Sequence, residues 1–286
     1  MKSKHNFWLG IFFHLLPCGR GGLTLQHYFL FILIFIFSFS AKAEEKNWEL
    51  GLGLGALHGP DYRGSAEYRT FASPIPYFLY HGKFIRSDRD GIRGSFFESN
   101  NLEFSLSASA AISPDTDENE LRQGMPELGS TFEIGPSLNY KLTGNDFSNG
   151  LTLQLPLRAV FAFADDAGYA GYLFQPQLAY RTKFADWNLH YRLGITYADN
   201  RYHDYYYSVT PEYATSTRPT FDASSGYSGF YSQIAFTRKI KSEKLNMRLA
   251  FFLRYENLSG SDFTDSPLVE TRDVWRSGMA IIWVIR

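Results

Sequence analysis

Cysteine is almost absent from this chain of 286 residues, and an excess of positive charge is missing altogether. The one cysteine, Cys18, precedes an apolar run near the N-terminus. If the segment around that run is a cleaved secretory signal, the mature chain has neither a disulfide bond nor a thiolate. No acidic residue precedes Glu44, and four of the 28 basic residues do, which leaves 24 bases against 29 acids, a net charge of −5. This balance gives no indication of a nucleic-acid partner.

Groups that carry catalysis are also scarce. The mature chain has four histidines, His58, His81, His190 and His203, and none of them lies at metal-ligand spacing from another. A Gly-x-Ser-x-Gly nucleophile elbow is missing. A protease of the omptin type, which is an outer-membrane barrel, would need acids and an Asp-His pair near one rim of the barrel. His203 and Asp204 are adjacent in the sequence, which is not the spacing of the omptin pair. We therefore predict a protein without enzyme activity, metal or cofactor.

One acidic segment could bind a metal ion, which is the alternative to this prediction. Residues 114–120, PDTDENE, could hold Ca²⁺ or bridge lipopolysaccharide through divalent ions. The segment lacks the spacing of a dedicated calcium loop. A solvated external loop is the preferred interpretation.

The N-terminus has the features of a secretory signal. The apolar run covers residues 28–39, Lys2, Lys4 and Arg20 precede it, and Ala41-Lys42-Ala43 supplies a small-x-small cleavage site. We predict a signal peptide over 1–43, cleavage after Ala43, and one domain over 44–286. The alternative is an uncleaved anchor helix, for which the apolar core is short.

Alternating hydrophobicity dominates the remaining sequence. In 151–163, LTLQLPLRAVFAF, every odd position is apolar, while Thr152, Gln154 and Arg158 occupy even positions. A strand places successive side chains on opposite faces, so this segment has one apolar and one polar face. It is longer than an average soluble strand but suits a tilted crossing of a bilayer. The pattern recurs about ten times along the chain, which predicts an all-β, transmembrane, antiparallel up-and-down β-barrel.

The strands of a soluble β-sandwich also alternate between apolar and polar residues. The lengths of the loops distinguish a transmembrane barrel from such a sandwich. Short connections (144–149, 185–186 and 241–244) alternate with long polar ones (113–128, 199–226 and 258–272). Outer-membrane barrels have short periplasmic turns, long external loops and an even number of strands. We predict twelve strands, near 48–58, 71–81, 83–90, 91–98, 101–112, 129–143, 149–163, 169–184, 187–199, 227–240, 244–257 and 273–286. The third and fourth of these could instead be one bent strand over 83–98, and ten strands is the alternative count.

Two features depart from an ideal barrel. Pro136, Pro156 and Pro176 lie inside predicted strands, where proline removes a hydrogen-bond donor, and bulges are expected to absorb them. The chain ends on Arg286, although the last residue of such barrels is usually aromatic.

Several motifs resemble those of the MipA/OmpV family of outer-membrane proteins, over essentially all of 48–286. They are GLGLGAL (51–57), GPDYRGS (59–65), PIPY (74–77), MPELG (125–129), EIGPSL (133–138), YYYSVTPE (205–212) and DSPLV (265–269). The resemblance implies an outer-membrane barrel of the Gram-negative envelope without known catalysis. One member is described as a scaffold that joins a murein lytic transglycosylase to a murein synthase. Others are linked to adhesion, osmotic response or antibiotic susceptibility.

The predicted lumen face carries many basic residues, of which five arginines are the main candidates. They are Arg158, Arg181, Arg192, Arg248 and Arg254, with Glu49, Glu103, Glu133 and Glu256 among the acids of the same face. In one interpretation the charges interlock and fill a narrow barrel. In the other, a net positive lumen passes small anions. We favour the filled lumen.

The loop after residue 199 is rich in tyrosine. Tyr205, Tyr206 and Tyr207 are candidates for an external contact surface, as in an adhesin, but the loop could equally fold over the barrel. The segment 59–65 could also fold back over the barrel mouth. The leading prediction is a non-enzymatic outer-membrane scaffold for periplasmic peptidoglycan enzymes, in contact with outer-membrane lipid and lipopolysaccharide. A small-anion channel and an adhesin are the alternatives.

Overall fold

The computed structural model describes residues 48–80, 85–88, 91–111, 118–163, 168–242 and 245–285. The chain divides into two compact units, Met1–Lys46 and Asn47–Arg286. All described residues belong to the second unit. The predicted signal peptide, 1–43, and the last residue, Arg286, lie outside them.

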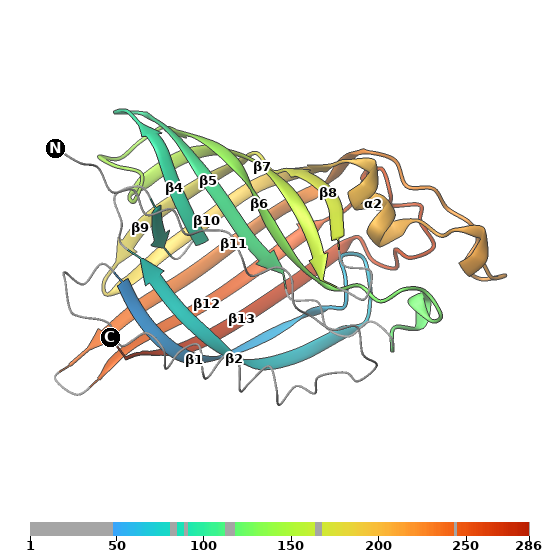
Figure 1. Cartoon of the computed structure of the whole chain (residues 1–286), viewed down its shortest axis with the longest axis horizontal. Coiled ribbons are helices and arrows are strands. Elements are labelled where there is room, and N and C mark those ends of the chain that lie inside the picture. The colour runs from blue at the N-terminus through green and yellow to red at the C-terminus, as the bar shows by residue number, and fades with distance from the viewer. Residues whose placement is uncertain are drawn as a thin grey trace, which may run out of the picture. The chain divides into compact units, whose positions relative to one another are not determined.

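The second unit is an antiparallel up-and-down β-barrel (Figure 1). Its strands are β1 (Trp48–Pro60), β2 (Tyr68–Tyr80), β3 (Ile85–Asp88), β4 (Gly91–Glu98), β5 (Leu102–Ala111), β6 (Ser130–Lys141), β7 (Gly150–Phe163), β8 (Gly168–Phe174), β9 (Gln177–Phe184), β10 (Trp187–Ala198), β11 (Gly226–Lys241), β12 (Asn246–Asn257) and β13 (Asp273–Val284). Within the described residues, the hydrogen-bonded order runs from β2 through β1 and β13 back to β3. β2 and β3 contact each other, which brings the two ends of the sheet together.

Twelve strand paths account for the thirteen described strands, because β8 and β9 follow one path. Both pair with β7 and with β10 in a single register, on either side of Gln175 and Pro176. The predicted strand 169–184 is therefore interrupted, since Pro176 has no backbone N–H to donate. Its carbonyl still accepts a hydrogen bond from the Ile195 N–H at 3.1 Å. The predicted count of twelve is confirmed.

The other two prolines remain inside β6 and β7. Pro136 and Pro156 sit where the β6–β7 pairing passes from Ile134–Ala159 directly to Ser137–Pro156 without a change of register. A Cβ on Gly135 would lie 2.0 Å from the Leu157 carbonyl oxygen. Only glycine permits this close approach of the two backbones. No bulge is needed here, contrary to the expectation from sequence.

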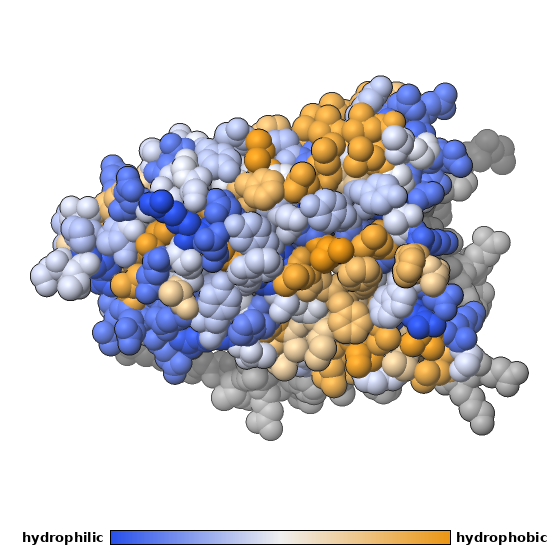
Figure 2. All heavy atoms as spheres, turned by 180° about the vertical axis from the view of Figure 1, so that it is seen from behind, coloured by the Kyte–Doolittle hydropathy of each residue, from blue (hydrophilic) through white to orange (hydrophobic). Residues whose placement is uncertain are grey.

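The outward face of the strands forms an apolar band. Leu54, for example, is 61% exposed, and outward side chains such as Leu157, Leu253 and Met279 are exposed too. Figure 2 shows hydrophobic residues gathered over the strands, with hydrophilic residues at the end that carries the long loops. Exposed aromatic residues flank the band: Tyr172, Tyr197 and Trp275 toward the long loops, and Tyr140, Phe184 and Trp283 toward the short turns. An exposed apolar band between two aromatic girdles is the surface of a transmembrane barrel.

The two ends of the barrel differ, as the sequence predicts. We call one the turn end, with described connections 99–101, 142–149, 185–186 and 242, 245. The other is the loop end, with 61–67, 118–129, 199–225 and 258–272. The loop end also contains elements that the sequence did not predict, α2 (Asn200–Tyr207), η1 (Glu120–Arg122) and η2 (Pro211–Tyr213). Asp199 begins α2, because its side chain accepts a hydrogen bond from the Tyr202 N–H. None of the helices among the described residues is long and apolar enough to cross a membrane.

Candidate functional site in the capped lumen

The connections at the loop end fold together into a cap with its own apolar core. We define the cap as the described residues 61–67, 118–129, 199–225 and 258–272. Its buried core consists of Tyr62, Leu128, Tyr207, Val209, Ala223, Leu258, Phe263 and Leu268, with Val274 of β13 beneath them. The rings of Tyr207 and Phe263 stack at 3.7 Å between centroids and 2° between planes. Such burial of large rings stabilises the cap as a folded element.

Two buried arginines tie the cap loops to one another. Arg218 donates hydrogen bonds to the carbonyl oxygens of Leu121, at 2.6 Å, and Tyr213, at 2.7 Å. Arg122 donates to those of Tyr206, at 3.2 Å, and Pro126, at 3.0 Å. A guanidinium has five donors, so one side chain can satisfy several carbonyls that lie far apart in sequence. The loops 118–129 and 199–225 are joined in this way.

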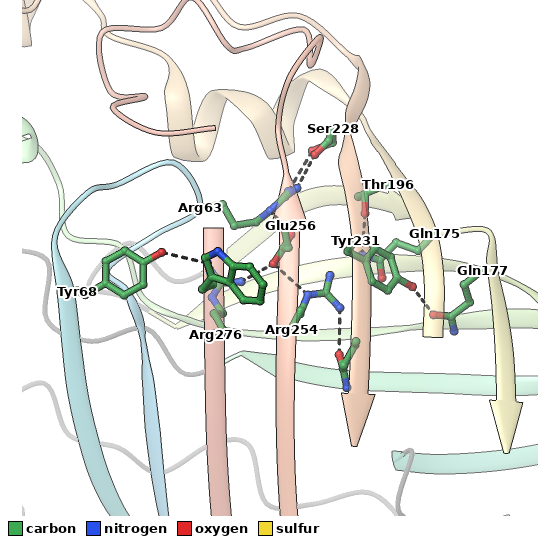
Figure 3. A network of polar contacts seen from close by, with 12 residues as sticks. Arg63, Tyr68, Gln175, Gln177, Thr196, Ser228, Tyr231, Arg254, Glu256 and Arg276 are labelled. Carbon is green, nitrogen blue, oxygen red and sulfur yellow. Dashed lines mark hydrogen bonds and ion pairs between the residues drawn. The ribbon is translucent and has the colours of Figure 1, made fainter. Parts of the chain in front are cut away.

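The cap reaches into the barrel through Arg63, which meets the buried Glu256 of β12 (Figure 3). Arg63 Nε lies 2.8 Å from the Glu256 carboxylate, and Arg254 and Arg276 each approach the same carboxylate at 3.0 Å. The side chain of Glu256 is 2% exposed. Burial by itself would lower the pKa of Arg63, but the facing carboxylate of Glu256 outweighs it and raises the pKa above its ordinary value. Arg63 therefore stays charged in the fold.

From this cluster, polar contacts continue along the lumen wall. Arg254 lies over the ring of Tyr231, 3.9 Å from its centroid, and donates to the Gln233 side chain at 3.2 Å. The Tyr231 hydroxyl donates to Gln177, which donates to Gln154 at 2.8 Å. Figure 3 shows Arg254, Tyr231 and Gln177 on the same part of the wall, with the Tyr231 hydroxyl directed at Gln177.

A second set of contacts surrounds Arg158 of β7. Its Nε lies 2.8 Å from Glu133 of β6, and its Nη1 donates to Ser107 of β5 at 3.2 Å. Its remaining nitrogen donates to Gln175, which in turn donates to Thr196 at 3.2 Å. These bonds link five adjacent strand paths across the wall.

The five arginines predicted to face the lumen do not form one group. Arg158, Arg192 and Arg254 line a common central cavity of about 270 Å³. Arg248 pairs with Glu49 nearer the turn end, and Arg181 donates to the Phe147 carbonyl oxygen of a turn at 3.1 Å. Arg158, Arg181, Arg248 and Arg254 thus each have a polar partner in the structure.

Three cavities follow one another along the lumen. The largest, about 410 Å³, lies directly beneath the cap and is lined by residues that include Tyr62, Tyr202 and Arg276. We call it the chamber. The central cavity follows, and a third of about 290 Å³ extends toward the turn end. Phe252 lines all three, so this one ring marks the point where they adjoin.

The three candidate contact tyrosines lie in α2, inside the cap. Tyr207 is fully buried, so it offers no external contact surface in this structure. Tyr205 accepts a hydrogen bond from the Gly129 N–H at 2.8 Å, and both Tyr205 and Tyr206 pack against the cap core. Burial raises the pKa of both phenols. The loop folds over the barrel, which was the alternative from sequence.

The segment 59–65 folds back over the barrel mouth, as suggested by its sequence. Asp61, Tyr62 and Ser65 are buried, and the Tyr62 hydroxyl donates to the Leu268 carbonyl oxygen at 2.8 Å. Sequence reasoning nevertheless missed two residues of the Glu256 cluster, Arg63 and Arg276. Alternation places Arg276 inward, between outward Trp275 and Ser277, whereas no local pattern identifies Arg63.

The sequence predicts a protein without a metal site, with a Ca²⁺ site in the acidic segment 114–120 as the alternative. No cluster of three or more His, Cys, Asp or Glu that could hold a metal occurs among the described residues. Most of the acidic segment lies outside them. Its described end holds Glu118, paired with Arg69 at 2.8 Å, and the buried Asn119.

The chain was compared with solved structures, with curated proteins and with sequence models of protein families. Two solved structures are similar at low TM-scores. The CymD monoaromatic hydrocarbon channel has a TM-score of 0.27 and 11% identity, covering 84% of this chain and 88% of that one. A Pseudomonas aeruginosa FadL homologue has a TM-score of 0.26 and 10% identity, covering 85% of this chain and 64% of that one. A search of curated proteins found no match. The sequence model described as MltA-interacting protein MipA matches residues 52–285, and the chain belongs to this family.

Proposed function

We propose that this protein is a non-enzymatic outer-membrane barrel that binds murein-remodelling enzymes of the periplasm at its turn end. Residues 1–43 would be removed on export. An even number of strands then leaves both chain ends on the periplasmic side, together with the short turns. The cap would face the cell exterior, next to lipopolysaccharide.

The observation that carries this proposal is the folded cap over a lumen whose wall charges are paired with one another. Two ion pairs lie on the lumen wall beneath the cap, Arg63 with Glu256 and Arg158 with Glu133. An open aqueous pore needs a continuous unobstructed path. A lumen held together by paired side chains favours a binding role. The family description, MltA-interacting protein, supports a partner among murein lytic transglycosylases.

The turn end offers a basic and aromatic surface for such a partner. Lys183, Lys239 and Lys241 lie around Asp186, which pairs with Arg238 at 2.8 Å. Beside them, Arg238 lies over the ring of Trp187, 5.8 Å from its centroid, and Phe184 is 74% exposed. Aromatic residues and arginine are enriched where protein interfaces gain most of their affinity.

The proposed contact surface also includes the turns 99–101 and 144–149 at the same end of the barrel. The sequence assigns the turns 81–83 and 241–244 to it as well, of which 81–83 and 243–244 lie outside the described residues. A standard interface buries about 800 Å² on each partner, so the contact would include the rim as well as the turns.

A charge-reversal experiment tests the proposal. The double variant Arg238→Glu, Lys241→Glu should weaken binding to a purified murein lytic transglycosylase of the same cell by at least about tenfold, since rim charges steer and orient association. Binding is measured by surface plasmon resonance on the refolded barrel in detergent. The matched control is Arg201→Glu, an exposed arginine at the loop end. Unchanged affinity of the double variant, or an equal loss in the control, would contradict a turn-end interface.

A second candidate function is a small-anion channel. The observation that favours it is the series of three adjoining cavities, with Arg192 lining two of them. Conduction through this path would require the ring of Phe252 and the pairs around Glu256 to rearrange.

A further inference from the structure

The chamber beneath the cap is lined by more positive than negative side chains. Five arginines border it, namely Arg63, Arg69, Arg158, Arg254 and Arg276, against three acids, Asp61, Glu133 and Glu256. Arg158 is balanced by Glu133, and Arg69 is balanced by Asp61 at 2.9 Å and by Glu118. The imbalance is therefore confined to the Glu256 cluster.

In that cluster one carboxylate serves three guanidinium groups. Among the residues that the structure describes, Glu256 is the one acid within salt-bridge distance of Arg63, Arg254 and Arg276, which leaves two positive charges in excess in this set. The side chain of Arg63 is 11% exposed and that of Arg254 is 20% exposed. Partly buried charges of one sign repel each other unless a counter-charge joins them.

Arg276 is the member of the cluster that is most accessible from the chamber. Its side chain is 32% exposed, and it donates from Nη1 to Glu256. Its stem packs against Gly59, where an added Cβ would lie 2.9 Å from Arg276 Cγ. A guanidinium can bind a carboxylate or a phosphate through two donors at once, so it can bind Glu256 and an incoming anion together.

The remaining wall of the chamber combines polar side chains, such as Ser109, Thr131 and Gln175, with apolar ones. Leu57, Phe71 and Phe252 line it beside the rings of Tyr202 and Tyr206. A volume of about 410 Å³ is within the range of pockets for small organic molecules. A site of this kind combines one charged anchor with aromatic and aliphatic contacts.

We propose that the chamber binds a small organic anion, with a carboxylate or phosphate group at Arg276 and Arg254 and an apolar ring against Phe71 and Phe252. The bound anion supplies the counter-charge that the Glu256 cluster lacks. The site lies at the loop end and is independent of the proposed turn-end interface.

Calorimetric titration of the refolded chain 44–286 in detergent tests this assignment with four probes. Benzoate and phenyl phosphate should bind, whereas benzyl alcohol should bind at least about tenfold more weakly and benzylammonium should not bind. Raising the chloride concentration should weaken benzoate binding. Arg276→Gln should reduce benzoate affinity at least about tenfold, and Arg201→Gln, at an exposed arginine of the loop end that does not line the chamber, is the matched control.

Folding of each variant is judged by its heat-modifiable migration in gel electrophoresis. If Arg276→Gln fails to refold, a second variant tests the proposal. Ser109 is exposed and lines the chamber, so Ser109→Asp adds a negative charge without removing any contact of the cluster. It should weaken benzoate binding and spare any benzyl alcohol binding. The proposal is overturned if neither anion binds, if benzylammonium binds as tightly as benzoate, or if the variant that folds binds benzoate like the parent chain.

Discussion

His203 is the residue whose surroundings give the cap a dependence on pH. Its side chain is fully buried in α2, its ring lies 4.8 Å from that of Phe263, and Nδ1 contacts the Ser224 carbonyl oxygen. Burial lowers the pKa of His203 from 6.5, and the charge of Arg63 adds to this, while Ser224, Asp262 and Asp199 oppose it. The folded cap therefore holds His203 neutral.

We predict that the cap loses stability as the pH falls below about 6.5, the pKa of histidine in an unfolded chain. There the unfolded loop takes up a proton that the folded cap excludes, at a slope of at most about 1.4 kcal/mol per pH unit. The loss stops once the pH passes below the lowered pKa of the folded state. Protease cleavage of the cap loops, measured from pH 7.5 to 5.0, should accelerate through this window.

The control for this prediction removes the titrating group. His203→Gln should lower cap stability at every pH, because it disturbs the packing on Phe263, but it should flatten the pH dependence. A slope as steep as in the parent chain would assign the effect to another group.

Alternation predicts which side chains enter the lumen but not which of them meet. Arg158 and Arg254 follow directly from the strand period, since each lies between outward apolar neighbours. Arg63 is 193 positions from its partner Glu256, and it reaches Glu256 only because the cap folds inward. Pairing across such a distance depends on the packed structure, so no local pattern reveals it.

Among the elements, the hairpin between β9 and β10 contains a position that suits glycine. Its two-residue turn connects the paired residues Phe184 and Trp187, and Ala185 adopts φ = 50°. A non-glycine residue pays about 1–2 kcal/mol in this left-handed region, whereas glycine adopts it without a steric cost.

We therefore predict that Ala185→Gly stabilises the barrel by up to about 1 kcal/mol, because part of the gain is offset by the entropy of glycine in the unfolded chain. Ala185→Val should have the opposite effect, since a β-branched residue is strained at positive φ. The midpoints of urea unfolding in detergent, followed by tryptophan fluorescence, measure both. Equal midpoints for the three proteins would show that strain at this turn does not limit stability.

Most strands could be predicted from sequence because a half-exposed strand leaves a period of two in hydrophobicity. The break between β8 and β9 follows from Pro176, yet sequence could not show whether a bulge or an interruption would result. α2 was missed because it lies in a polar, tyrosine-rich loop with no apolar period, and its start at Asp199 is a signal only once a helix is suspected.

For the whole molecule, the folded cap and the paired lumen lead to a prediction about conductance. Refolded chain 44–286 should give no steady open steps in planar bilayers at neutral pH. Phe263→Ala should produce flickering steps, since losing a fully buried ring costs about 3–5 kcal/mol and loosens the cap.

One outcome of the conductance measurement on the parent chain would contradict this prediction. Steady anion-selective steps would favour the channel, and charge reversal at Arg181, Arg192 and Arg254 would then have to change the selectivity. A matched variant outside the cap core, Tyr213→Ala, should remain as silent as the parent chain, because Tyr213 only borders that core.

The seam between β1 and β13 has a consequence for biogenesis. Gly51 pairs with Val284, and a Cβ on Gly51 or Gly53 would lie 2.5 or 2.6 Å from a carbonyl oxygen of β13. β1 thus pairs with β2, which follows it directly in the sequence, and with β13, which is the last described strand. Contacts of such long sequence separation form slowly. During folding the free edge of β1 must be shielded until β13 pairs with it, so closure of the barrel depends on the whole sequence between these two strands.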